Sequence, residues 1–524
     1  MIVSIFNDII GPAMRGPSSS HCAAALRIGR IARDLMGSEF KEVLIEFAKN
    51  SALATTHDSH GSDMGLFGGL LGLELTDEKL IFSRDLLESS GVKIDIRIVD
   101  IFDEHPNTYR IFLKNSEQEH SFEAISVGGG IIEATRIDNF PISISGDYYE
   151  TLLWVENQEA EIKRRIKAVY DDQNIDNVLI HEDARSKVFL IEIKSIQQPG
   201  DDLIKGLKRS LLVKELKIIK PVLPVLSGKN IRVPFNNAEE MLNCVGASDI
   251  PLWQLAIEYE KQRARLSEAE VIERMIEIVR IIRSSISAGI AGTAYEDRLL
   301  PPQSGRYLEQ LKTGRFLNAG ILNRAIAYVS ALMEVKSSMG VIVAAPTAGA
   351  CATLPGTVVA VAEELDLSEK EMAKGLLAAG LIGVFIANQA TFSAEIGGCQ
   401  AETGSASSMA AAALVTLAKG NLKQSLAAAS MALQNMLGLI CDPVANRVEV
   451  PCLGRNLSAA SNAIVCANLA LADYDQVIPL DEVIEAAFRV GKQLPRELRC
   501  TGLGGLSTTK TSLELERKLR IKSD

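Results

Sequence analysis

The chain is organised around two segments, GGCQAETG at residues 397–404 and CDPVANRVEVPC at residues 441–452. They contain Cys399, Cys441 and Cys452. The last two stand 11 positions apart, and the first lies 42 positions upstream of Cys441. Zinc ribbons and ferredoxin-type runs instead place cysteines about two to four residues apart. Spacing alone therefore leaves the packing interpretation open, because cysteine is among the residues most often buried.

The residues that flank these cysteines favour a bound group over simple packing. Glycines precede Cys399, and Pro443 and Pro451 bracket a loop between two stretches of helical pattern. A packing cysteine usually stands inside an apolar run, whereas these stand where such runs end. Three thiolates without a fourth suit an iron–sulfur cluster with one open iron, which can act as a Lewis acid on a substrate.

Composition argues against several classes of protein. The chain has 524 residues and 47% hydrophobic content, enough for several domains and a large core. A net charge of −11 and two tryptophans argue against nucleic acid as a partner. The apolar stretch at 376–387 is short and contains glycines, which predicts a buried helix and no membrane partner. Without a signal-peptide pattern at the N-terminus, we expect a cytoplasmic, reducing location that suits thiolate–metal chemistry.

The distribution of histidines predicts where the site is built. All six histidines lie at or before position 181, whereas the three cysteines follow position 398. A histidine that acts beside these cysteines must therefore come from the N-terminal part of the chain. This predicts a site between domains.

Two polar segments of the N-terminal part are candidates for that site. GPSSSH at residues 16–21 precedes a helical pattern, and its hydroxyl and N–H groups suit a carboxylate or phosphate. For any one of these serines a plain N-cap is the favoured interpretation. TTHDSHGSD at residues 55–63 holds His57 and His60 three positions apart. Imidazole suits a general base near neutral pH, but a structural histidine is as plausible here. A metal pair is disfavoured because no further Cys or His ligands stand nearby.

Periodicity predicts a multidomain α+β protein with three parts. Residues 1–147 form an N-terminal α+β domain with strands near 93–100 and 109–113, and residues 235–524 form a mostly α-helical domain. Residues 148–224 lie between these two domains in the sequence. Their pattern predicts strand, helix, strand, strand, helix and strand, the ferredoxin-like βαββαβ order. The predicted segments are 149–156, 158–170, 177–182, 188–194, 201–212 and 216–222, with His181 expected on a solvated face.

Three separated stretches resemble iron–sulfur-dependent L-serine dehydratase (L-serine ammonia-lyase), and the likeness covers nearly the whole chain. They read GPSSSHCAAALRIGR, GGCQAETGSASSMAAA and GLICDPVANRVEVPC. The resemblance implies that Cys399, Cys441 and Cys452 hold a [4Fe-4S] cluster and that L-serine is converted to pyruvate and ammonia. It also implies a homodimer, an ACT-like module at 148–224 and no need for pyridoxal phosphate.

Roles for further residues follow from the same resemblance. His60 is the candidate base or acid, and Asp63 is the residue expected to orient its imidazole. The expected substrate-binding residues are Ser18, Ser19, Ser20, His21, Thr347 and Gly349, the last two in the Pro- and Gly-interrupted loop at 345–356. Cys351 of that loop is expected to be a packed residue and not a fourth ligand.

Two departures from the family pattern leave questions open. Gln434 and Asn435 stand where the family usually carries a Glu-His pair, which leaves the exact substrate open. Cys500 stands where the family carries an acid, and capping of the open iron by its thiol is a hypothesis. The 148–224 module is as consistent with a spacer or dimer interface as with an effector site.

Two other functions remain as alternatives. One is a related cluster-dependent lyase that acts on another β-substituted amino acid or hydroxy acid. The other is a non-catalytic sensor that couples a cluster to an amino-acid-binding module. The segments at 16–21 and 55–63 argue against the sensor, because a sensor has no use for a base.

Overall fold

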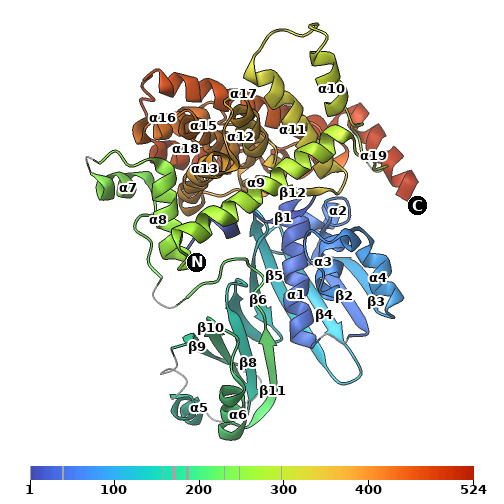
Figure 1. Cartoon of the computed structure of the whole chain (residues 1–524). Helices are drawn as coiled ribbons and strands as arrows, with labels where there is room; N and C mark the ends of the chain where they lie inside the picture. Colours follow the sequence, from blue (N-terminus) through green and yellow to red (C-terminus); the bar gives the residue numbers. More distant parts are fainter. Residues whose placement is uncertain are drawn as a thin grey trace.

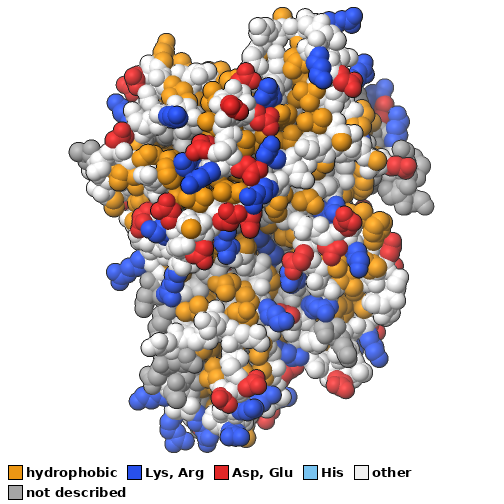
Figure 2. Space-filling model, in the orientation of Figure 1, with side chains coloured by type: hydrophobic (Ala, Val, Ile, Leu, Met, Phe, Trp, Pro, Cys, Tyr) orange, Lys and Arg blue, Asp and Glu red, His pale blue; other side chains and the backbone are white. Residues whose placement is uncertain are grey.

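The structure is a computed structural model that describes residues 2–37, 40–156, 159–167, 173–183, 188–228, 231–246, 248–296 and 298–523. An N-terminal sheet domain, a small second sheet module and a large helical domain follow one another along the chain (Figure 1). This confirms the predicted multidomain α+β class. Charges of both signs are interspersed over the face shown in Figure 2.

The N-terminal domain is a six-stranded sheet covered by helices. Its strands are β2 (Glu42–Ala48), β3 (Lys93–Val99), β4 (Thr108–Lys114), β5 (Glu119–Gly128), β6 (Ile131–Ile137) and β7 (Phe140–Ile144). Their order is β3-β2-β4-β5-β6-β7, parallel between β2 and β3 and antiparallel elsewhere.

Two helices of this domain cross very closely. The helices of the domain are α1 (Ala24–Met36), α2 (Leu53–Thr56), α3 (Ser62–Leu71) and α4 (Ser83–Ser89). A Cβ added at Gly65 of α3 would lie 2.1 Å from the Cys22 carbonyl oxygen, and one at Gly69 would lie 2.1 Å from that of Leu26. Glycine therefore lets α3 approach the backbone just after His21, which positions the GPSSSH segment.

The second module has the predicted βαββαβ order. Its elements are β8 (Tyr149–Val155), α5 (Glu159–Arg165), β9 (Ile175–Glu182), β10 (Phe189–Ser195), α6 (Asp201–Ser210) and β11 (Val213–Ile219). The strands form an antiparallel sheet in the order β11-β8-β10-β9. Residues 157–158, 168–172 and 184–187, within the predicted helix and strand–strand turn, lie outside the described residues.

The two faces of this second sheet bury different neighbours. One face packs its apolar side chains against α5 and α6. The other places Trp154, Leu190 and Ile219 in the core of the N-terminal domain. His181 also lies toward that shared interface and pairs with buried Glu192 (Nε2 to Oε2, 2.8 Å), so its predicted place on a solvated face is wrong.

The helical domain surrounds one long apolar helix, α13 (Glu369–Gln389). The other helices are α7 (Ala238–Val245), α8 (Leu252–Ala264), α9 (Glu268–Ala291), α10 (Ser304–Leu311), α11 (Ile321–Ser337), α12 (Thr353–Glu364), α14 (Ala394–Gly397), α15 (Ser405–Leu417), α16 (Leu422–Gln434), α17 (Cys452–Leu471), α18 (Leu480–Gln493) and α19 (Lys510–Ser523). Within the described chain α13 alone is long and apolar enough to cross a membrane, and most of it is buried inside the structure. It matches the buried helix predicted at 376–387.

The first residues of the chain pack in the helical domain and not in the domain that follows them. Ile5 and Ile9 lie in the core cluster of that domain, where Gly380 and Gly383 of α13 make room for them. Strand β1 (Ala13–Arg15) pairs antiparallel with β12 (Val341–Val343). This segment, which the prediction includes in the N-terminal domain at 1–147, also packs in the helical domain and ties the two domains together.

A buried histidine joins the N-terminal domain to the second module. His120 of β5 is 4% exposed and stacks beside Trp154 with ring centroids 5.6 Å apart. Its Nδ1 pairs with Asp138 at 3.0 Å and its Nε2 with Glu215 of β11 at 3.3 Å, while Lys217 pairs with Glu215. Burial alone would lower the pKa of His120, but the two carboxylates outweigh it and raise the pKa to about 9.

This histidine predicts a pH dependence of stability. Because its folded pKa lies above the ordinary value, its stabilisation is complete below about pH 6.5 and disappears as the pH rises through about 9. We expect the free energy of unfolding to fall by roughly 2–3 kcal/mol over that window through this residue. Urea titrations of the protein and of His120→Asn across pH 6–10 measure it. An identical pH slope in the variant would contradict this assignment.

Candidate active site

The three central cysteines converge in the interior of the helical domain. Cys399 follows α14 and opens a π-helical turn at Gln400–Gly404, Cys441 lies in the loop after α16, and Cys452 begins α17. Their exposed fractions are 3%, 5% and 8%. Burial raises the pKa of the Cys399 and Cys452 thiols, and the charge on neighbouring cysteines adds to the effect.

A fourth thiol reaches this centre from the C-terminal tail. Cys500 is hydrogen-bonded to Cys441 through its side chain, which together with burial raises the pKa of Cys441. The backbones also pair: Cys441 N donates to the Leu498 carbonyl at 2.8 Å, and Cys500 N donates to the Cys441 carbonyl at 2.9 Å. The tail is therefore part of the site.

One carboxylate holds the tail on the loop at 441–452. Asp442, 3% exposed, accepts from Arg455 at 2.5 Å and from the backbone N–H of Leu506 at 2.8 Å. Further along, Ser507 donates to the Pro443 carbonyl at 2.8 Å. The loop that carries Cys441 is thus fixed from α17 on one side and from the tail on the other.

His60 meets this loop from the N-terminal domain. It is 2% exposed, and its Nε2 donates to the Asn446 carbonyl at 2.9 Å, which defines the Nε2–H tautomer. Burial and the neighbouring His21 lower the pKa of His60 to about 3. The imidazole is therefore neutral at pH 7, and its Nδ1 retains a lone pair that can accept a proton.

The expected partnership of Asp63 with His60 is not found. Asp63 instead accepts from His57, with 2.9 and 3.0 Å between its two oxygens and His57 Nδ1. His57 lies over Phe47 at a ring-centroid distance of 5.3 Å. Because α3 begins at Ser62, Asp63 points along the first turn toward the preceding loop. Asp63 thus orients His57, and the Asn446 carbonyl orients His60.

The GPSSSH segment forms a hydrogen-bonded chain with His21. Thr56 donates its one hydroxyl proton to the Ala52 carbonyl at 2.7 Å, so it accepts from His21 Nε2–H at 3.0 Å. His21 Nδ1 then accepts from the Ser18 hydroxyl at 3.0 Å. The His21 and His60 rings meet edge to face with centroids 4.8 Å apart. Burial, aided by His57, lowers the pKa of His21 to about 3.

The other two serines of the segment are buried at the junction with the helical domain. Ser19 accepts from the backbone N–H of Ala348 at 3.1 Å, which docks the segment on the loop at 345–356. Ser20 is buried beside it along the chain. The serines therefore lie at the junction of the two domains, and their role in binding a substrate stays a prediction.

Thr347 and Gly349 position a carboxylate in the site. The Thr347 hydroxyl donates to Glu402 Oε1 at 2.6 Å. A Cβ at Gly349 would lie 2.6 Å from the same oxygen, so only glycine leaves room for this carboxylate. Burial raises the pKa of Glu402 to about 7, and nearby Glu395 contributes to the rise. Glu395 accepts from Ser393 at 2.7 Å.

Several residues that hold the site together were not singled out from the sequence. Asn456, fully buried on α17, donates to the carbonyls of Gly349 and Cys452 and accepts from Thr353. The sequence signal for Asn456 is its position, four residues after Cys452 within an alanine-rich helix. Asp442 and Arg455 were missed because a pair 13 positions apart follows no helical or strand period.

Gln434 and Asn435, which depart from the family pattern, form hydrogen bonds that hold neighbouring helices together. Gln434 donates to Ser430 and to the Gln476 carbonyl, both at 3.1 Å. Asn435 donates to Asn462 Oδ1 at 2.7 Å and contacts Cys466. Both side chains therefore serve the packing of α16 against α17 and the loop before α18.

Cys399, Cys441 and Cys452 are the residues that would hold an iron–sulfur cluster. Among the described residues, no three His, Cys, Asp or Glu side chains lie close enough to hold one metal ion. Thiolates that ligate different irons of one cluster are spaced more widely than ligands that share an ion, and three sulfurs suit iron. Buried Ser59 Oγ, Asn446 Oδ1 and Arg499 Nε lack a partner in the described chain, which leaves donors and acceptors for a ligand.

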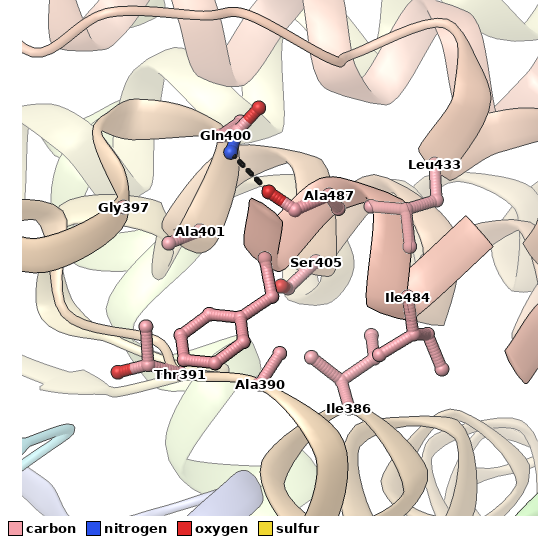
Figure 3. A pocket seen from close by; sticks show the side chains of 11 residues that line it. Ile386, Ala390, Thr391, Gly397, Gln400, Ala401, Ser405, Leu433, Ile484 and Ala487 are labelled. Atoms are coloured by element: carbon pink, nitrogen blue, oxygen red, sulfur yellow. Dashed lines mark hydrogen bonds between the residues drawn. The ribbon is translucent and has the colours of Figure 1, made fainter. Parts of the chain in front are cut away.

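An apolar pocket lies beside the segment that carries Cys399 but is separate from the site. Ile386, Ala390, Leu433 and Ile484 line it together with Gly397, Gln400 and Ala401 (Figure 3). The Gln400 amide donates to the Ala487 carbonyl at 2.7 Å across its rim. None of the cysteines and histidines described above lines this pocket, so we assign it to packing between α13, α16 and α18.

Comparison with known proteins decides the family. Residues 247–507 match the serine dehydratase alpha chain family. The chain is also 38% identical over 285 residues to the probable L-serine dehydratase alpha chain of Bacillus subtilis, covering 54% of this chain and 95% of that protein. The chain belongs to the L-serine dehydratase family.

The likeness to L-serine dehydratases continues into the N-terminal part. The probable L-serine dehydratase beta chain of Bacillus subtilis is 40% identical over 156 residues, which cover 30% of this chain and 69% of that protein. The L-serine dehydratase of Helicobacter pylori is 28% identical over 535 residues, covering 97% and 98% of the two chains. This member of the family is thus a lyase that joins both parts in one chain.

The clamp at Asp442 predicts how the tail of this family member behaves. We expect Asp442→Ala to free the tail, because a charge-assisted hydrogen bond contributes about 1.5–3 kcal/mol. Trypsin cleavage at Arg496 and Arg499 should accelerate about tenfold, read by mass spectrometry. Asp481→Ala is the control, because Asp481 of α18 likewise accepts from backbone N–H groups, those at the start of α7. This variant should leave tail cleavage unchanged. Equal tail cleavage in both variants would contradict the clamp.

Proposed function

We propose that this chain is an L-serine ammonia-lyase that converts L-serine to pyruvate and ammonia with a [4Fe-4S] cluster held by Cys399, Cys441 and Cys452. The observation that carries the proposal is the convergence of three buried thiols with neutral, buried His60, which bonds to the loop between two of them. Membership in the L-serine dehydratase family supports the substrate. When bound, the cluster supplies a Lewis-acidic iron that makes the β-hydroxyl a better leaving group.

His60 is the group we propose to take the α-proton. Its Nε2–H is committed to the Asn446 carbonyl, so Nδ1 is the basic atom. Burial keeps the ring unprotonated, and the bond to Asn446 fixes its orientation before substrate arrives. Loss of the α-proton and of the hydroxyl gives an enamine, which tautomerises and is hydrolysed to the 2-oxo acid and ammonia.

Two carboxylates and the unpartnered polar atoms are proposed to orient the substrate. Glu395 and Glu402 are near enough to each other to act on the pKa of Glu402, and an α-ammonium between them would relieve that repulsion. The partly buried Arg499, whose Nε lacks a partner in the described chain, offers a donor to a carboxylate. Burial by both domains excludes water from the reacting atoms.

Two cysteines of one helix provide the test of the cluster. We expect Cys452→Ala to lose most of its iron and sulfide after anaerobic reconstitution, together with all activity on L-serine. Cys466→Ala, on the same helix and equally free, should keep both, because Cys466 contacts Asn435 and Asn462. Iron and sulfide analysis and a 2-oxo acid assay over a panel of 3-substituted amino acids measure this. Full turnover by metal-free protein would refute the proposal.

The role of His60 has a separate test. We expect His60→Asn to retain the cluster and lower kcat by about 10²–10⁴-fold, the usual contribution of a general base. Exchange of the α-hydrogen of L-serine with deuterated water, followed by NMR, should fall in parallel. His181→Asn, whose partner Glu192 lies in the second module, is the control. Unchanged exchange in His60→Asn would assign the proton to another residue.

A further inference from the structure

A fully buried lysine stands beside the cysteine centre without an ion-pair partner. Lys336, in the last turn of α11, has no exposed surface. Its Nζ donates to the Val448 carbonyl, in the loop that leads to Cys452. In the part of the chain that the structure describes, no carboxylate forms an ion pair with it. One donor of its side chain is therefore satisfied by the chain, without an ion pair.

Lys336 lies near groups of the site, as its electrostatic effects on them indicate. It acts electrostatically on Cys452, Cys351, Glu402 and Glu449. Both acids already have hydrogen-bond partners. Glu449 accepts from the backbone N–H groups of two residues, Leu299 and Leu300, at 2.9 Å each, and Glu402 accepts from Thr347.

The backbone of Lys336 also anchors the segment that leads to the serines. A Cβ at Gly16 would lie 2.3 Å from the Lys336 carbonyl oxygen and 3.0 Å from its Cγ. The start of the GPSSSH segment therefore packs directly on this residue. Lys336 lies where the GPSSSH segment, the loop at 345–356 and the loop at 441–452 meet.

A second cation nearby differs from Lys336 in one respect. Arg455 lies near Cys399 and Cys441, and its charge is matched by Asp442 at 2.5 Å. Buried charges are retained in proteins where an opposite charge compensates them. The buried cysteines are neutral thiols while protonated, and they become anionic when they bind a metal. Glu402 and Glu449 thus offset part of the Lys336 charge, and the thiolates would add anionic partners when the site is loaded.

We propose that Lys336 is a positioning residue that balances the negative charge of the cysteine thiolates once the cluster is bound, and thereby raises the cluster's reduction potential and slows its loss. This inference rests on the proposed cluster. A fixed positive charge stabilises the more negative, reduced state of a cluster, so removing it makes reduction harder. Groups outside the ligand shell typically change metal affinity by about 10–100-fold.

The experiment separates the charge of Lys336 from its hydrogen bond. Lys336→Gln retains a donor for the Val448 carbonyl and removes the charge, whereas Lys336→Arg keeps the charge. Reduction potentials of the anaerobically reconstituted proteins are measured by spectroelectrochemical titration, and iron release to a chelator is followed in the same samples. Lys194→Gln, which removes a partly buried, ion-paired lysine of the second module, is the control.

We expect Lys336→Gln to show a more negative potential and about tenfold faster iron release, with Lys336→Arg close to the unaltered protein. If Lys336→Gln fails to fold, Lys336→Met carries the same expectation. A lower unfolding temperature with an unchanged potential would reduce Lys336 to a structural role and overturn the inference. Failure of the unaltered protein to take up iron and sulfide would instead refute the proposed function.

Discussion

The hydrogen bond from His60 Nε2 to the Asn446 carbonyl, 2.9 Å long, is the contact on which the site depends. It joins the only part of the chain that holds histidines to the loop that carries two of the three central cysteines. Because a carbonyl can only accept, this bond also defines the tautomer of the imidazole. Position and chemical state of this imidazole are therefore set by one interaction across the domain boundary.

Such a contact requires that the two domains keep a constant orientation. The first residues of the chain keep this orientation constant, because they pack in the helical domain before the chain enters the N-terminal sheet. Ile5 and Ile9 fill the space left by glycines of α13, β1 pairs with β12, and Ser19 binds the loop at 345–356. These contacts are spread around the site, so a shift of either domain would break several buried interactions together.

Burial gives the site its electrostatic character. It favours neutral His21, His60 and thiols, and it raises the pKa of Glu402 toward neutrality. Arg455 forms an ion pair with Asp442, whereas Lys336 forms no ion pair among the described residues. In the proposed function, the cysteine thiolates and the substrate carboxylate would supply further anions to this centre.

Local spacing and residue chemistry determined the βαββαβ order of residues 148–224 and the helical C-terminal domain. They also drew attention to Cys399, Cys441 and Cys452, whose choice as cluster ligands came from the resemblance to the family. The absence of histidine beyond position 181 was enough to predict a site between domains. Tertiary structure alone decided that Asp63 serves His57, that residues 3–14 pack in the helical core, and that Asp442 and Asn456 hold the site together. These contacts join segments up to several hundred positions apart and depend on side-chain directions, which periodicity in a sequence does not encode.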